Sequence, residues 1–223
     1  MRKQPAKKKQ GIYEIYGLNG CSNIINEKNL QIKRIDIMVG GNAEKKKWVN
    51  SLFKANKYPV HRMIKDQFLK KYAGKRTQGI VIAFQGSIIQ SLPSFKISKD
   101  NECLLVVDNL EDPQNLGQII RTAECAHISG LLLPEHRSVQ MTDAVLQVSQ
   151  GAFVHLPIYR CKNLHQQLRT LKKEGFWIIG VENCINAMLW HELDYKRKLV
   201  LVMGSEGKGI RPVIVKTCDE LMT

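Results

Sequence analysis

The sequence lacks the hallmarks of several large classes of protein. No stretch approaches the roughly 18 consecutive apolar residues of a membrane-spanning helix, and the basic start lacks the apolar core of a signal peptide. The six cysteines form no CxxC pair and no Cys/His cluster at metal-ligand spacing. We therefore expect reduced, mostly buried thiols, no bound metal, no membrane association and a cytoplasmic location.

Acidic residues are scarce in the first part of the chain. Residues 1–99 contain 21 Lys and Arg against 5 Asp and Glu, whereas residues 100–223 contain 13 against 15, which gives net charges of +16 and −2 within the total of +14. A strongly cationic module gains free energy when it releases counterions from a polyanion, so nucleic acid is the leading partner. The alternative is a basic, solvated surface with no such partner.

This uneven charge predicts two domains, of which the first is small and basic. Residues 1–10 carry five basic residues and no acid, which indicates a disordered arm. Residues 11–86 are predicted to form an α/β domain, in which the helix over 63–72 turns Ile64, Phe68 and Leu69 inward. Residues 87–99 mix Ser, Pro and Lys and suit a linker. The other elements expected in this domain are strands over 32–40, 58–60 and 79–84 and a helix over 43–57.

Residues 100–223 alternate strands and helices. The strands are almost continuously apolar, which favours an α/β fold with a mostly parallel sheet covered on both faces. In such sheets ligands bind beyond the carboxyl ends of the strands. The predicted strands cover 103–108, 130–134, 155–159, 176–182 and 198–204, and the predicted helices cover 118–127, 143–150 and 163–174.

Two loops of this second domain are candidates for chemistry. DNLEDPQNLGQIIRTAECA (108–126) leaves a buried strand and enters a helix, with Asn115 able to cap or orient a partner and Arg121 projecting from the helix. LVLVMGSEGKGI (199–210) runs from a strand into a glycine-dense turn whose backbone can approach a ligand closely. The spacing fits neither a Walker A loop nor GxGxxG. Taken singly, each loop is also compatible with an ordinary structural turn.

Together the two loops resemble the first and second motifs of the SpoU (TrmH-like) family within the SPOUT methyltransferases. The resemblance continues through PEHRSVQMTDAVLQVSQGA, through NLHQQLRTLKKEGFWIIG and through CDELM near the end of the sequence. Upstream, IYGLNG and TQGIVIAF are similar to parts of the family's substrate-binding domain, which is like ribosomal protein L30e. That domain points to the branch that methylates guanosine of large-subunit (23S) ribosomal RNA.

The resemblance implies an S-adenosylmethionine-dependent 2'-O-methyltransferase with a Rossmann-like sheet, a C-terminal trefoil knot and a homodimer. It assigns Arg121, reaching across the dimer, to the reacting 2'-hydroxyl and Asn115 and Glu206 to organising it. Gly204 is assigned to the cofactor, and we place its neighbours Met203, Gly207 and Gly209 with it. Because a guanidinium stays protonated in proteins, we expect Arg121 to stabilise charge on the ribose oxygen rather than to remove its proton.

One departure from the family concerns its third motif, which is expected directly after CDELMT, where this sequence stops at Thr223. That motif supplies part of the knot, of the cofactor pocket and of the dimer interface, so we expect the knot to be incomplete here. The alternatives are a transfer-RNA ribose 2'-O-methyltransferase and a catalytically inactive RNA-binding relative. RNA is preferred over DNA because only RNA offers a 2'-hydroxyl. The candidates for phosphate contacts are Lys45, Lys46, Lys47, Lys70, Lys71, Lys75 and Arg76.

Overall fold

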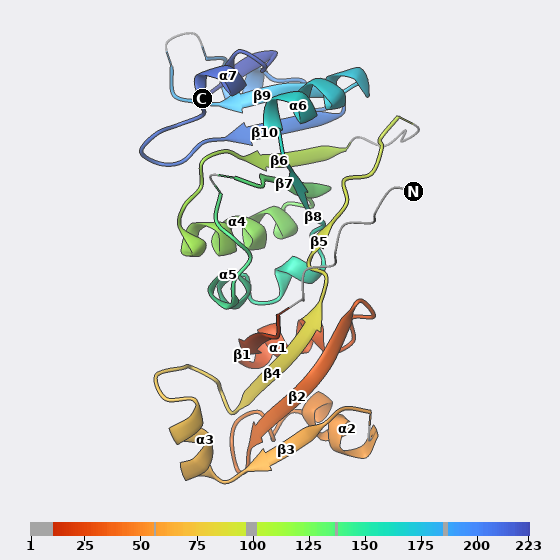
Figure 1. Ribbon diagram of the computed structural model, residues 1–223, viewed down its shortest axis with the longest axis vertical. Helices are drawn as coiled ribbons and strands as arrows, with labels where there is room; N and C mark the ends of the chain where they lie inside the picture. Colours follow the sequence, from red (N-terminus) through yellow and green to blue (C-terminus); the bar gives the residue numbers. More distant parts are fainter. Residues whose placement is uncertain (1–10, 56, 97–101, 137, 185–186) are drawn as a thin grey trace, which may run out of the picture. The chain divides into compact units, whose positions relative to one another are not determined.

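The computed structural model describes residues 11–55, 57–96, 102–136, 138–184 and 187–223 (Figure 1). The chain divides into two compact units. The first runs to Ser87 and includes Thr142–Val154, and the second comprises Ile88–Met141 and His155–Thr223. Within the described ranges, no helix has the length and apolarity needed to cross a membrane. The predicted basic arm, residues 1–10, lies outside the described residues.

The first unit is built on a four-stranded sheet in the order β1-β4-β2-β3. The pairs β1/β4 and β4/β2 are antiparallel and β2/β3 is parallel. Its strands are β1 (Tyr13–Tyr16), β2 (Leu30–Met38), β3 (Val60–Met63) and β4 (Ile80–Gly86), and its helices are α1 (Leu18–Ile24), α2 (Lys47–Ala55) and α3 (Lys65–Lys71).

The prediction for α3 was wrong in which side chains it buries. Phe68 is fully buried, but Ile64 and Leu69 are 58% and 49% exposed. Tyr72, directly after the helix, packs with Phe68 at a ring distance of 5.0 Å and is itself buried. Because Tyr72 and Phe68 are four residues apart, they lie on one side of the helix and leave Leu69 in solvent. The short strand predicted over 58–60 lies instead at Val60–Met63, as β3.

Residues Thr142–Val154 belong to the first unit although the sequence pattern groups them with the second. They form α5 (Asp143–Val148) and the 3-10 helix η1 (Ala152–Val154). The Gln147 amide accepts from Tyr16 N at 2.9 Å and donates to Tyr16 O at 3.0 Å, as a strand neighbour would. The rings of Phe84 and Phe153 are stacked 6.0 Å apart. By these contacts the segment groups with the first unit, whereas the predicted domains place it within residues 100–223.

The second unit is built on a parallel sheet in the order β11-β9-β10-β6-β7-β8-β5. Every strand pair in this order is parallel. The predicted α/β class with a mostly parallel sheet is therefore confirmed. The strands are β5 (Ile89–Gln90), β6 (Cys103–Val107), β7 (Gly130–Pro134), β8 (Ile158–Cys161), β9 (Trp177–Val181), β10 (Leu199–Met203) and β11 (Glu220–Met222), and the helices are α4 (Pro113–Cys125), α6 (Leu164–Lys173), α7 (Pro212–Val215) and the 3-10 helix η2 (Trp190–Glu192).

Both faces of this sheet are covered, as nearly continuous apolar strands require. On one face, Val200 and Val202 of β10 join a buried cluster with Leu168 of α6 and Ile214 of α7. On the other face, Leu199 packs in a cluster with Leu193, which follows η2. Alternate residues of β10 thus point into two different cores, and the sheet is held rigid between them.

The segment predicted as a linker, 87–99, is not free of secondary structure. Its residues Ile89 and Gln90 form β5, which pairs with β8 at the edge of the large sheet. Phe95 is buried, and its carbonyl accepts from Lys198 Nζ at 2.6 Å while its N–H donates to Glu174 at 2.8 Å. Residues 88–96 therefore belong to the second unit.

Candidate functional site

The two candidate loops start side by side at the carboxyl edge of the large sheet. Strands β6 and β10 are parallel neighbours, and Val107 is in register with Met203. Asp108, the first residue of the first loop, donates its N–H to Met203 O at 2.8 Å. Two segments about a hundred residues apart in sequence are thereby placed at one edge, where parallel sheets bind ligands.

The first loop turns into α4 earlier than predicted. Helix α4 begins at Pro113, not at Gln118, and the Asp112 side chain accepts from Gln114 N at 2.8 Å as its N-cap. An aspartate followed by proline is a strong helix start, because the carboxylate satisfies a free N–H and proline has none to satisfy. Of the two roles considered for Asn115, the helix cap is taken by Asp112, and the orientation of a partner stays a prediction. Asn115 lies in the first turn with an exposed side chain.

Two ion pairs hold the loops together. Asp108 is fully buried, and Arg211 follows the glycine-rich turn. The Asp108 oxygen Oδ1 accepts from Arg211 Nε at 2.9 Å and lies 2.7 Å from Arg211 Nη2. The backbone N–H of Arg211 also donates to Asp108, at 3.1 Å. On the solvent side, Lys208 Nζ lies 3.0 Å from Glu111 Oε1. The buried pair fixes where the second loop ends relative to the first.

The glycine-rich turn is too tight for side chains at two of its positions. A Cβ at Gly204 would lie 2.0 Å from the carbonyl carbon of Gly209, so only glycine fits there. Gly209 has a φ of +61°, and its N–H donates to Ser205 O at 2.9 Å. A Cβ at Gly207 meets nothing within 4 Å. Gly204 and Gly209 are therefore required by the shape of the turn, whereas Gly207 lies at its open tip.

Glu182 is a residue of this site that the sequence reasoning missed. It follows β9, the other neighbour of β10, and its carboxylate accepts from Ile210 N at 3.0 Å. Residues 181–183 and 204–209 line a cavity of about 380 Å³. A lone glutamate after a strand carries no motif, and its only sequence signal is its position at the end of a predicted parallel strand. Among the residues that the structure describes, no three His, Cys, Asp or Glu side chains lie together as a metal site requires.

The three residues assigned to catalysis lie on two elements. Asn115 and Arg121 project from α4, and Glu206 lies in the glycine-rich turn next to Gly207, three residues after Met203 at the end of β10. All three side chains are exposed. In the part of the chain that the structure describes, no hydrogen bond or ion pair joins them to one another. They are therefore accessible to a ligand but are not prearranged as a triad.

The basic residues proposed for phosphate contacts fall into two groups in the first unit. One precedes and begins α2, the other spans the end of α3 and the following turn, and Figure 1 shows these two helices apart from each other. Lys71 and Lys75 are engaged by carboxylates, at 2.6 Å from Asp36 and 3.2 Å from Glu14. Five of these side chains are exposed and have no such ion pair with any residue that the structure describes: Lys45, Lys46, Lys47, Lys70 and Arg76.

Asp36 is the buried centre of this second group. Lys71, Arg34 and the Tyr72 hydroxyl all donate to its carboxylate. Burial by itself raises the pKa of Asp36, but the hydrogen bonds from Lys71 and Tyr72 and the charges of Arg34 and Lys71 outweigh it, so the pKa lies below its ordinary value. Asp36 therefore stays ionised and holds Lys71 in place.

Comparison with known proteins matches the second unit most directly. The family model described as "SpoU rRNA Methylase family" matches residues 102–223. A Staphylococcus saprophyticus protein named as a TrmH family tRNA/rRNA methyltransferase is 41% identical over 116 residues, which cover 52% of this chain and 46% of that protein. A Synechocystis protein named as a tRNA/rRNA methyltransferase is 42% identical over 120 residues, 54% of this chain and 31% of that protein. The chain thus spans about half or less of the length of these relatives.

Solved structures share the fold over nearly the whole chain. An rRNA methyltransferase from Sinorhizobium meliloti, determined with AdoMet bound, has a TM-score of 0.74 at 21% identity and covers 95% of this chain and 77% of its own. The SpoU methyltransferase AviRb from Streptomyces viridochromogenes, in complex with AdoMet, has a TM-score of 0.75 at 17% identity and covers 96% and 80%. Because the family model matches more than half of the residues, this chain belongs to the SpoU rRNA methylase family.

Proposed function

We propose that the chain transfers a methyl group from S-adenosylmethionine to the 2'-hydroxyl of a ribose in ribosomal RNA, with guanosine as the nucleoside. The observation that carries this proposal is the joining of the two family motifs at one sheet edge. Asp108 opens the first motif loop, Arg211 closes the second, and their buried ion pair brings both loops to the carboxyl ends of β6 and β10. The relatives named as tRNA/rRNA methyltransferases support the same reaction class.

The cavity beside the glycine-rich turn fits the polar parts of the cofactor. Its lining combines the backbone of 204–209 with the carboxylates of Glu182 and Glu206 and the amide of Asn183. Carboxylates can accept from ribose hydroxyls and from the ammonium of the amino-acid portion, and backbone groups can pair with adenine. We assign cofactor binding to Gly204, with Met203, Gly207 and Gly209. When bound, S-adenosylmethionine supplies an electrophilic methyl group on a sulfonium.

The protein's own contribution is placement and charge. A guanidinium remains protonated, so Arg121 binds the ribose oxygen or the adjacent phosphate as a cation and stabilises the negative charge that this oxygen gains as its proton passes to solvent water. Glu206 orients Arg121, and Asn115 offers an amide donor and acceptor to the ribose. Because the three side chains are exposed and unpaired with one another, RNA binding is required to bring them into working positions.

The first unit serves as the RNA-binding module in this proposal. Five of the seven predicted phosphate contacts are exposed and have no carboxylate partner among the described residues, and Lys71 and Lys75 are partly neutralised by Asp36 and Glu14. We therefore expect Lys45, Lys46 and Lys47 to contribute more to RNA affinity than Lys71 and Lys75. A homodimer and a cytoplasmic location remain predictions.

Transfer of a tritiated methyl group from S-adenosylmethionine to unmodified ribosomal and transfer RNA tests this function. The expected acceptor is ribosomal RNA, and labelling of transfer RNA alone would replace it with the alternative substrate. Arg121→Lys keeps the charge but loses the planar, two-pronged donor, so we expect turnover to fall by roughly a hundredfold, within the loss seen when a donor to a reacting oxygen is removed. Arg169→Lys, an exposed arginine on α6, is the matched control. Full turnover in Arg121→Lys would contradict the role of Arg121.

A further inference from the structure

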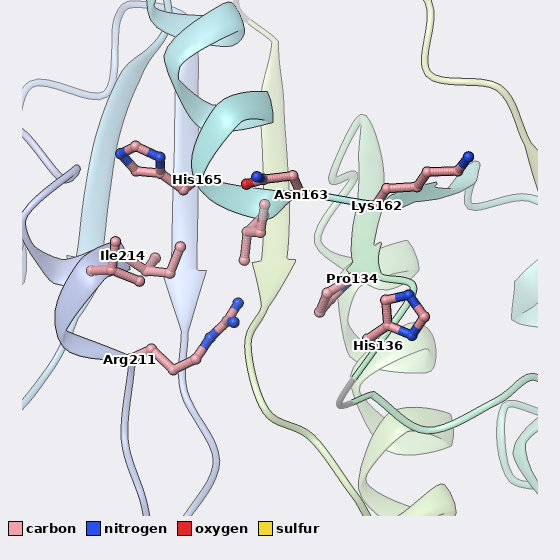
Figure 2. Close-up of a pocket in the computed structure, with 9 residues that line it drawn as sticks. Pro134, His136, Lys162, Asn163, His165, Arg211 and Ile214 are labelled. Carbon is pink, nitrogen blue, oxygen red and sulfur yellow. The ribbon is translucent and has the colours of Figure 1, made fainter.

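A second cavity of about 380 Å³ opens at the carboxyl ends of β7 and β8 (Figure 2). Pro134 and His136 border it from the end of β7, Lys162 and His165 from the junction of β8 and α6, and Arg211 from the start of α7. Three segments that are distant in sequence thus contribute to one hollow at the edge where parallel sheets bind ligands.

The ionisable side chains that line this cavity are all basic: His136, Lys162, His165 and Arg211. The fully buried carboxylate of Asp108 pairs with Nε and Nη2 of Arg211. In the described part of the chain Arg211 Nη1 has no partner, and the side chain keeps 26% exposure. Figure 2 shows the guanidinium directed into the space below the start of α6. The ion pair therefore orients Arg211 without using all of its donors.

These side chains select the kind of ligand. Lysine and arginine are donors only, and a protonated histidine also donates from both nitrogens. The side-chain oxygen of Asn163, Oδ1, already accepts from Gln166 N at 3.0 Å, which leaves the side-chain NH2 group as a further donor. A cation would be repelled, and an apolar ligand would leave these donors unpaired. A compact anion with several acceptor oxygens satisfies them, and a phosphate is such an anion.

We propose that this cavity binds a backbone phosphate of the RNA strand whose ribose is methylated. The assignment rests on the proposed function and adds a substrate-positioning site to it. Arg211 links the cavity to the methylation site, because its partner Asp108 is the first residue of the loop that leads into α4. A phosphate held here fixes the strand relative to Arg121. Phosphate contacts position a nucleic acid without reading its sequence, which suits a site made of donors alone.

The test compares the RNA affinity of two double variants of the full chain. Lys162→Ala/His165→Ala removes two of the cavity's basic side chains, and Lys173→Ala/His191→Ala removes the same residue types from exposed positions outside it. Arg211 is left intact because its loss would also disturb folding. Binding of a short single-stranded RNA is measured by fluorescence anisotropy across a series of salt concentrations. We expect the cavity variant to bind roughly tenfold more weakly and its salt slope to fall by about 0.7, the value for one phosphate on a single strand.

Inorganic phosphate provides a second readout that does not depend on RNA. NMR titration with phosphate should shift the imidazole signals of His136 and His165 and leave His191 unchanged, with chloride as the reference anion. Equal RNA affinities and equal salt slopes for the two double variants would overturn the proposal, as would unmoved His136 and His165 signals. Calorimetric binding of S-adenosylmethionine and methyl transfer are measured on the same proteins. If the chain binds RNA but transfers no methyl group, the proposed reaction fails while the affinity comparison still decides the cavity.

Discussion

Replacing Asp108 by alanine perturbs the contact that joins the two motif loops. Asp108 is fully buried, and Arg211 is 26% exposed. The substitution leaves a largely enclosed guanidinium without its counter-ion and frees the backbone N–H of Arg211. The loop that follows β10 is then no longer tied to the end of β6 by this ion pair.

The size of the effect follows from burial. Removing one partner of a buried ion pair costs about 3–5 kcal/mol, because the other charge stays uncompensated. Water can reach part of Arg211, so Asp108→Ala should cost about 3 kcal/mol. Arg211→Ala leaves a carboxylate with no exposure and should cost about 5 kcal/mol. The double variant should cost less than the sum of the two, because neither charge is then left behind.

The assay has to resolve one part of the molecule, since a chain of two units does not unfold as a single two-state system. Hydrogen exchange of the β6 and β10 amides, followed by mass spectrometry in increasing denaturant, gives the local opening free energy. Lys208→Ala is the control, because Lys208 and Glu111 are 67% and 75% exposed and such pairs contribute about 1 kcal/mol or less. An Asp108→Ala variant that loses no more opening free energy than this control would contradict the role of the buried ion pair. So would a double variant whose loss equals the sum of the losses in Asp108→Ala and Arg211→Ala.

Three further predictions concern other parts of the two units. Gly204→Ala should lower the melting temperature of the second unit, since overpacking costs about 1–3 kcal/mol. Gly207→Ala, at an open position, should leave that temperature unchanged. Equal effects of the two substitutions would contradict the described turn. Glu182→Gln keeps an acceptor for Ile210 N–H but loses the charge. Calorimetry should therefore show weaker S-adenosylmethionine binding, while hydrogen exchange of the Ile210 amide stays unaltered. Faster exchange of that amide would show that the role of Glu182 is purely structural. The folded pKa of Asp36 is lowered, so its stabilising effect is present at neutral pH and is lost as the pH falls below about 3.8. Asp36→Asn should therefore flatten the acid limb of the stability curve of the first unit, and an unchanged limb would contradict this.

Much of the second unit could be predicted from local pattern. The strands from Cys103 to Met203 are apolar runs of the length that buried parallel strands have, and each is followed by a turn signal. The glycine-rich turn was identified from the density of glycines after an apolar strand, and the shape of the turn explains Gly204 and Gly209 physically. The earlier start of α4 was also readable, because Asp112 and Pro113 form a recognisable helix start.

The rest depended on contacts between distant residues. The Asp108–Arg211 pair spans 103 positions, and no periodicity or spacing predicts which Arg meets which buried Asp. Glu182 joins the site only because β9 lies beside β10. The α5 segment has the same helical pattern whichever unit it packs on, and its contacts with Tyr16 decide the matter. Ile64 and Leu69 are apolar at helical spacing, yet Tyr72 takes the buried position instead.

Nucleoside analysis tests most directly whether the chain methylates a ribose oxygen of RNA. Unmodified ribosomal RNA is incubated with the chain and S-adenosylmethionine, digested to nucleosides and analysed by mass spectrometry. We predict 2'-O-methylguanosine, with the methyl group on the ribose fragment. A methyl group found on a base, or RNA left unmodified by a chain that demonstrably binds both RNA and S-adenosylmethionine, would contradict it.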